Sequence, residues 1–336
     1  MKNYLLLTAS AVLVLSSCSN NEIVENNDLK NDEPKTMKFQ TYVPGATRAI
    51  WAEEAIGENV RNNGFYLWTN QTKVVNGEEE QVEGLMTFDG EREWVMGDEQ
   101  LQWSTDLNAE VTFYAGYSNN GSDDLYVSDE ADFGGMVLGG INVADGDNDY
   151  MFAADTASYN KANGNVTLNF SHILSQVEVR VGGTTENYNY EVAGVVLSAP
   201  YSNYYHIADK AFVVQDEETT DYELYDGISA DGVTVADALA VGLLEKYAEQ
   251  EQVYSKIMVV PGECSLRLKY RIYADGENPG WSSIGYEDDD QSFTFNVQAG
   301  YRNIVNVKLN PATRAMTFSV DVVTWTDAQD ENNLDL

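Results

Sequence analysis

Side chains that could do catalytic or metal chemistry are sparse in this chain. Asp145, Asp147 and Asp149 have the spacing of the first three ligands of a calcium loop. Position 6 of that loop is Tyr150 where glycine is required, and position 12 is Thr156 where glutamate is required, which excludes an EF-hand. An irregular cation site and a solvated turn both stay open for the three aspartates. The sequence predicts no cofactor and no defined metal centre.

The two histidines favour structural roles over catalysis. His172 falls within an alternating strand pattern, and a general base would need a partner that the sequence does not show. His206 follows two tyrosines and has no ligand spacing. No nucleophile elbow, zinc-protease motif or phosphate loop occurs. Nothing among the 55 acidic residues singles out a pair for glycoside hydrolysis. A secreted glycosidase is therefore a weaker hypothesis than the two surface-protein functions considered below. We therefore predict that the protein is not an enzyme.

Cys18 is the cysteine whose surroundings point to covalent chemistry. Lys2 precedes an apolar run from Tyr4 to Leu15, and Ser16 and Ser17 follow immediately before the cysteine. This arrangement is typical of a secretory signal, and the last four residues resemble the lipobox of bacterial lipoproteins. The resemblance implies a signal peptide of residues 1–17, cleavage before Cys18 and acylation of its thiol. Membrane contact would then be through the lipid anchor alone, because the apolar run is too short to span a bilayer.

The composition fits an exposed protein without a disulfide framework. Asp plus Glu is 55 and Lys plus Arg is 19, for a net charge of −36, so we expect repulsion from phosphate backbones and no nucleic-acid partner. With Cys18 acylated, Cys264 has no partner within the chain. Residues 18–36 are polar and acidic and are interpreted as a disordered tether between the lipid and the first domain.

Alternation of apolar and polar residues recurs along the chain and predicts an all-β fold. Such alternation indicates strands with one buried and one wet face, as in antiparallel sheets packed into sandwiches. Glu178 and Arg180, interleaved with three valines, are expected to face water. The apolar positions are Met37, Phe39, Thr41, Val43; Val111, Phe113, Ala115, Tyr117; Val166, Leu168, Phe170; Val177, Val179, Val181; Leu266, Leu268, Tyr270, Ile272; Phe293, Phe295, Val297; Val305, Val307, Leu309; and Met316, Phe318, Val320, Val322.

One segment reads as a short helix, in the C-terminal half. Thr234 to Asp237 looks like a helix cap, and apolar residues follow at helical spacing as far as Tyr247. The Gly182-Gly183-Thr184-Thr185 stretch interrupts two strand series, so the domain boundary is placed there. The predicted domains are residues 37–183 and residues 184–336, the second ending in an acidic tail.

Four separated stretches give the chain a resemblance to the fimbrillins, subunits of the lipoprotein-derived pili of Bacteroidetes. They are Thr47-Arg48-Ala49, which resembles the processing site of that family; residues 149–154; residues 170–177, which resemble its Phe-x-His-Ala-Leu-Ser-x-Val strand; and a closing set made of Pro261-Gly262, Tyr301 to Leu309 and Val323-Thr324-Trp325. Together with the first strand they cover residues 37–326.

The resemblance implies two tandem β-sandwiches of the transthyretin-like type and assembly by strand exchange. A trypsin-like protease would cut between Arg48 and Ala49, and the strand carrying Met37, Phe39, Thr41 and Val43 would be displaced from its groove. A neighbouring pilus subunit would refill the groove with a C-terminal strand. The implied localisation is the outer membrane as a lipoprotein precursor, then the fimbrium on the cell surface. The ligand for adhesion, on host or bacterial surfaces, is not identified.

The donor strand is not fixed by the resemblance. After Trp325 the chain carries four acids and only three apolar residues, which is a poor pattern for filling apolar pockets. Met316, Phe318, Val320 and Val322 alternate better and are the candidate donor strand. A second Thr-Arg-Ala triplet at Thr313–Ala315 directly precedes that strand and is not expected to be cut. Shaft, tip and accessory positions in a pilus all stay open.

A second function class, a static surface lipoprotein that binds glycans, rests on aromatic clusters. Tyr201, Tyr204 and Tyr205 form one cluster, and Tyr188 and Tyr190 form another. Stacked aromatic rings suit sugars, but the same residues are common in the cores of sandwiches.

Overall fold

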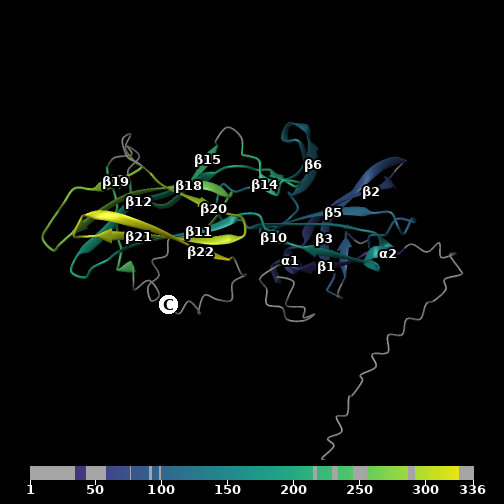
Figure 1. Ribbon diagram of the computed structural model, residues 1–336, viewed down its shortest axis with the longest axis horizontal. Helices are drawn as coiled ribbons and strands as arrows, with labels where there is room; N and C mark the ends of the chain where they lie inside the picture. Colours follow the sequence, from purple (N-terminus) through teal and green to yellow (C-terminus); the bar gives the residue numbers. More distant parts are fainter. Residues whose placement is uncertain are drawn as a thin grey trace, which may run out of the picture. The chain divides into compact units, whose positions relative to one another are not determined.

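The computed structural model describes residues 35–42, 58–75, 77–90, 93–97, 100–214, 218–228, 234–244, 256–286 and 292–324. All of them belong to one unit of chain, residues 34–336. The regular secondary structure of the described part is almost entirely β-strand (Figure 1), as the alternating sequence patterns predicted. Within it, no helix has the length and apolar character needed to cross a membrane.

The first group of strands encloses a core that we call the N-terminal core. A six-stranded antiparallel sheet has the order β10 (Ser171–His172), β8 (Tyr150–Ala157), β5 (Val111–Ser118), β2 (Phe65–Val75), β3 (Glu78–Phe88) and β4 (Trp94–Met96). A separate pair, β1 (Lys38–Tyr42) and β9 (Asn165–Asn169), runs parallel. Helices α1 (Glu58–Asn63) and α2 (Tyr159–Ala162) are short. The core includes Met37, Phe39, Phe65, Met86, Trp94, Trp103, Val111, Phe113, Val166, Leu168 and Phe170.

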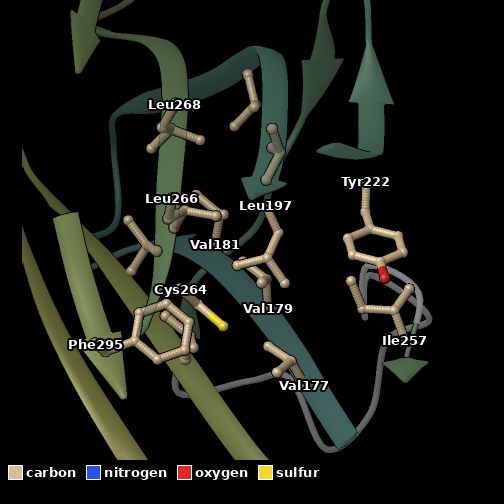
Figure 2. Packing of buried hydrophobic residues seen from close by; sticks show 14 of the residues in the cluster. Val177, Val179, Val181, Leu197, Tyr222, Ile257, Cys264, Leu266, Leu268 and Phe295 are labelled. Carbon is tan, nitrogen blue, oxygen red and sulfur yellow. The ribbon is translucent and has the colours of Figure 1, made fainter. Parts of the chain in front are cut away.

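The second group encloses the C-terminal core. One sheet has the order β17 (Ile257–Val259), β11 (Ser175–Gly183), β21 (Tyr301–Asn310) and β22 (Ala315–Thr324), in which β11 and β21 run parallel. The other has the order β15 (Thr219–Asp226), β12 (Asn189–Pro200), β18 (Gly262–Tyr273) and β19 (Ser282–Ile284); β16 (Leu239–Ala240) also pairs with β12, and β20 (Phe293–Val297) with β18. Figure 2 shows valines of β11 packed against Leu197, Leu266 and Leu268 from the opposite sheet.

A third, smaller core lies where the two groups meet. A four-stranded sheet has the order β14 (Ala211–Phe212), β13 (Tyr205–His206), β7 (Gly135–Gly139) and β6 (Tyr126–Glu130), with the short 3-10 helix η1 (Ala131–Phe133) after β6. Its apolar face joins residues from both halves of the chain, including Leu138, Tyr150, Leu174, Tyr205 and Val260. The predicted boundary between residues 183 and 184 stays a prediction.

The helix predicted from Thr234 to Tyr247 is wrong over the part that the structure describes, residues 234–244. Leu239–Ala240 form strand β16, antiparallel to β12. The Val241 amide donates to the Tyr190 carbonyl (2.9 Å), and the Gly183 amide donates to the Gly242 carbonyl (2.9 Å). Cross-strand pairing therefore satisfies backbone groups that a helix would have satisfied internally. A helix through this segment would also contain Gly242 in its interior, where glycine is about 1 kcal/mol less favourable than alanine.

Candidate functional site

Strand β1 and the residue just before it, Met37, carry the residues that the sequence placed on a displaceable strand. Met37, Phe39 and Thr41 are buried, with exposed fractions of 3%, 8% and 8%. The residues between them, Lys38 and Gln40, face outward and are exposed. The period-2 prediction for these positions is thus confirmed, while Val43 lies outside the described residues.

In the described part of the chain, β1 is held by a single strand ladder. It pairs in parallel with β9 from Lys38↔Asn165 to Tyr42↔Asn169. Just before β1, the chain is also paired on its other side: Thr36 forms an isolated antiparallel bridge with Gln102, the Met37 amide donates to the Leu101 carbonyl (2.8 Å), and the Trp103 amide donates to the Lys35 carbonyl (2.8 Å). An open cavity of about 320 Å³ lies next to β1 and is lined by Thr36, Met37, Lys38, Phe39, Glu93, Trp94 and Gln100. A strand with one ladder can leave after fewer hydrogen bonds break than a strand paired on both edges.

The groove beneath β1 is aromatic and apolar. The Phe39 ring meets the Phe113 ring edge to face, with 5.9 Å between centroids, and Trp103 meets the same Phe113 ring at 6.1 Å. Thr41 points into the same core, and among the described residues its buried hydroxyl oxygen has no hydrogen-bond partner. A buried hydroxyl without a partner costs about 1–3 kcal/mol. The inward face of β1 is therefore apolar and well packed except at Thr41.

The candidate donor residues lie in β22, at the edge of its sheet. β22 pairs with β21 along its length, from Tyr301↔Thr324 to Asn310↔Ala315, without a bulge. Met316, Phe318 and Val320 are half-buried against the C-terminal core, whereas Val322 is 60% exposed. Phe318 stacks on Phe293 with centroids 4.0 Å apart and an interplanar angle of 5°. The predicted alternation is thus present at Met316, Phe318 and Val320 but not at Val322, and within the described residues only one ladder holds β22 as well.

The second Thr-Arg-Ala triplet lies at the turn between β21 and β22. Arg314 has a left-handed backbone (φ 51°), and its side chain is 59% exposed. Its guanidinium lies 3.2 Å from the Glu277 carboxylate, and the Tyr270 hydroxyl donates to its carbonyl oxygen (3.4 Å). Cys18, Arg48 and Ala49, the predicted lipidation and processing residues, lie outside the described residues.

The residues weighed for cation binding and catalysis are placed apart. Asp145 and Asp147 are exposed, whereas the Asp149 carboxylate contacts Nδ1 of the buried His172 (2.9 Å). His206 pairs with Asp209 (2.8 Å) on a different sheet. Among the described residues, no three side chains of His, Cys, Asp or Glu come together in a way that could hold a metal ion. The contact with Asp149 instead fixes the orientation of the His172 ring.

The tyrosine clusters do not form a common exposed surface. Tyr190 and Tyr205 are buried, and burial raises the pKa of Tyr205 to about 12. Tyr201 packs against the core where the two strand groups meet, and Tyr204 packs on Phe133 with centroids 4.7 Å apart. Tyr188 alone of the five is largely exposed. Most of these rings therefore lie in hydrophobic cores. This is the structural interpretation that the sequence left open beside glycan binding.

Two buried groups show what the sequence revealed and what it missed. Cys264 is fully buried among Val177, Val179 and Phe295 (Figure 2), and burial raises the pKa of its thiol to about 12. Glu178 was expected to face water but is fully buried, because Arg180 (2.7 Å) and Arg302 both bind its carboxylate. Arg302 comes from β21, 124 positions away, so no local pattern could have indicated the pair.

Comparison with known proteins places this arrangement in context. The sequence pattern of the fimbrillin-like family matches residues 47–325. A fimbrial protein from Bacteroides vulgatus shares the fold, with a TM-score of 0.56 and 14% identity over 87% of this chain and 100% of that chain. A candidate cell adhesion protein from Parabacteroides distasonis gives a TM-score of 0.46 and 9% identity over 87% and 98% of the two chains. No curated protein matches closely enough to count as a relative.

Proposed function

Because this chain belongs to the fimbrillin-like family, we propose that it is a pilus subunit, exported as a lipoprotein through Cys18, cleaved after Arg48 and assembled by strand exchange for surface adhesion. The single observation that carries the proposal is the state of β1. Its inward residues fill an aromatic groove, yet within the described residues one ladder and a short bridge just before the strand hold it. Family membership also supports a structural role over an enzymatic one.

Strand exchange needs a groove that binds an extended segment through both backbone and side chains. Once β1 leaves, β9 offers five residues of unpaired backbone, from Asn165 to Asn169. The pockets vacated by Met37 and Phe39 remain lined by apolar residues such as Phe113 and Leu168. An incoming strand with alternating apolar residues would restore both kinds of contact. The predicted partners are therefore other pilus subunits and, for maturation, a trypsin-like protease.

The experiment that tests this function compares the unchanged chain with the variant Arg48→Ala. We expect the unchanged chain to appear on the cell surface with Ala49 as its first residue and to form high-molecular-weight assemblies. The variant should fold but remain monomeric, because β1 stays tethered in its groove. N-terminal sequencing and native gel electrophoresis measure the two outcomes.

The matched control is Arg314→Ala, which removes the arginine of the other Thr-Arg-Ala triplet. It should mature and assemble like the unchanged chain, because an ion-paired arginine in a tight hairpin turn presents a poor protease substrate. Wild-type assembly of Arg48→Ala, or an N-terminus at Ala315, would contradict the proposed processing.

A separate prediction concerns the anchor. Replacing Cys18 with alanine removes the thiol that would carry the lipid, so we expect the precursor to lose membrane attachment or to stall before signal cleavage. Membrane fractionation and mass spectrometry of the N-terminal peptide provide the measurement. A normally processed Cys18→Ala protein that stays in the membrane fraction would rule out this anchor.

A further inference from the structure

Strand β22 presents a long free edge. It is ten residues long and has no bulge, and in the part of the chain that the structure describes only β21 pairs with it. Asp321 is its single charged residue. Backbone N–H and C=O groups along the other edge of such a strand are a template on which a further strand can pair.

The other edge strands that the structure describes are protected against such pairing. β15 is eight residues long but carries Asp221, Glu223 and Asp226. β6 is five residues long and ends in Asp129 and Glu130. The remaining edge strands have at most five residues each. Short length and charged side chains are the usual protection of sheet edges, and β22 has neither.

Large apolar side chains are exposed at one end of this edge. Val322 is 60% exposed and Val323 is 38% exposed. Tyr301, which lies on β21 opposite Thr324, is 36% exposed. Three of the seven large apolar side chains that are exposed among the described residues thus belong to one end of one ladder. Exposed apolar side chains that gather in this way mark a contact surface.

We infer that β22 pairs edge to edge with β22 of a second copy of this chain, antiparallel, with Ser319 opposite Ser319 on a two-fold axis. Each β22 keeps its ladder with β21, so two four-stranded sheets become one continuous sheet and neither copy loses a hydrogen bond. The contact goes beyond the strand exchange proposed above, because it needs no vacant groove and no cut after Arg48. While β22 is paired in this way, it cannot serve as a donor strand.

Electrostatic repulsion selects the register. Opposite residues of an antiparallel ladder share a face, so the two-fold axis passes through a residue and not between two. An axis at Asp321 would set two carboxylates opposite each other, and an axis at Val320 would leave them about 8 Å apart. An axis at Ser319 separates them by about 14 Å, which exceeds the Debye length at physiological salt.

The same register matches side chains by type. On the face that is directed to the core, Val322 lies opposite Met316 of the second copy. On the outer face, Val323 lies opposite Ala315 of the second copy. Apolar pairs across a ladder stabilise a sheet, so both exposed valines of each copy gain a suitable neighbour.

The contact is weak between free copies in dilute solution. Each chain has a net charge of −36, so two copies repel each other everywhere except at surfaces with few charges. The uncut variant Arg48→Ala therefore still runs as a monomer on a dilute native gel. Copies held side by side on a surface have a high local concentration, which favours the contact. Salt screens the repulsion, so association through this edge should strengthen as salt is added.

Cysteine cross-linking tests the contact in the absence of strand exchange. The experiment uses the full chain carrying Arg48→Ala and adds Ser319→Cys, Thr317→Cys or Asp321→Cys, one at a time. All three positions are exposed, so the cysteines should not disturb the core. Each protein is concentrated in high salt, oxidised and run on a non-reducing gel.

We expect a covalent dimer from Ser319→Cys that is at least about tenfold stronger than from the other two variants. In the inferred register the two Cα atoms at position 319 are about 5 Å apart, which suits a disulfide. The two atoms at position 317, and the two at position 321, are about 14 Å apart, beyond its reach. The chain without a new cysteine measures cross-linking through Cys18, and Cys264 is buried.

The other outcomes would overturn the inference. A stronger dimer from Thr317→Cys or Asp321→Cys would contradict the register. No dimer from any variant, or equal dimers from all three, would mean that β22 does not pair with itself. These results do not depend on cleavage or exchange, so they leave the proposed function to its own test.

A charge placed on the axis provides a second measurement. Ser319→Asp sets two carboxylates about 5 Å apart in the dimer, so it should weaken dimerisation about fourfold in sedimentation velocity runs at high protein concentration. The matched control is Thr219→Asp, which adds the same charge at an exposed position of β15. Urea unfolding should be unchanged in both, because both positions are exposed. Equal dimerisation of the two variants would contradict a contact at Ser319.

Discussion

Replacing Phe39 with alanine should lower the free energy of unfolding of the uncut precursor by about 3–5 kcal/mol, the usual range for a buried phenylalanine. Phe39 is 8% exposed, and its ring meets the Phe113 ring. The same substitution should leave the assembled form unaffected, because the proposed cut after Arg48 would remove residue 39 from the mature subunit. Urea unfolding of the precursor and of purified assemblies measures both effects.

The conservative variant Thr41→Val supplies the control for this comparison. It keeps the volume of the side chain and removes the buried hydroxyl, so the precursor should become more stable rather than less. A loss of several kcal/mol in assemblies made from Phe39→Ala chains would mean that β1 stays in its groove after assembly, which contradicts strand exchange.

The second large effect is expected at Glu178. Its side chain is fully buried between Arg180 and Arg302, and breaking a buried ion pair by removing one partner typically costs about 3–5 kcal/mol. We therefore expect Glu178→Gln to lower the free energy of unfolding by an amount in that range. Glu277→Gln is the matched control, because the Glu277–Arg314 pair is solvent-exposed and its loss should cost less than about 1 kcal/mol.

The acid dependence of stability should change in the same variant. Burial alone would raise the pKa of Glu178, but hydrogen bonds from Arg302 and Arg180 outweigh it and hold the pKa below the usual value of 4.5. A carboxylate whose pKa is lower in the folded than in the unfolded state stabilises the fold at pH values above its unfolded-state pKa. This stabilisation is lost as the pH falls below about 4.5. Glu178→Gln should therefore flatten the decline in stability below that pH. An unchanged decline would show that Glu178 does not contribute.

The sequence predicted those parts of the fold that depend on local pattern. Strict alternation at Met37, Phe39 and Thr41 correctly placed one face of β1 in a core. Successive side chains of a strand point to opposite faces, so residues at every second position share one face. Cys264, for which the sequence predicted only that it has no partner once Cys18 is acylated, lies buried in the C-terminal core.

The errors came where distant residues decide the outcome. Glu178 has the spacing of an outward residue, but Arg302, a neighbour only in the folded chain, covers it and neutralises it. Leu239 and Ala240 have helical spacing, but β12 supplies a ladder that local propensity cannot anticipate. The hydroxyl of Thr41 is equally invisible in sequence, since threonine is a common strand residue and only the packing shows that it lacks a partner.

The parallel pairing of β1 with β9 determines how a junction between subunits would respond to mechanical load. In the proposed exchange, a donor strand pulled along the direction of β9 would have its backbone hydrogen bonds from Asn165 to Asn169 loaded together. Peeling from one end would break them one at a time and require less force. A junction loaded along β9 would therefore resist rupture better than the same junction peeled from one end.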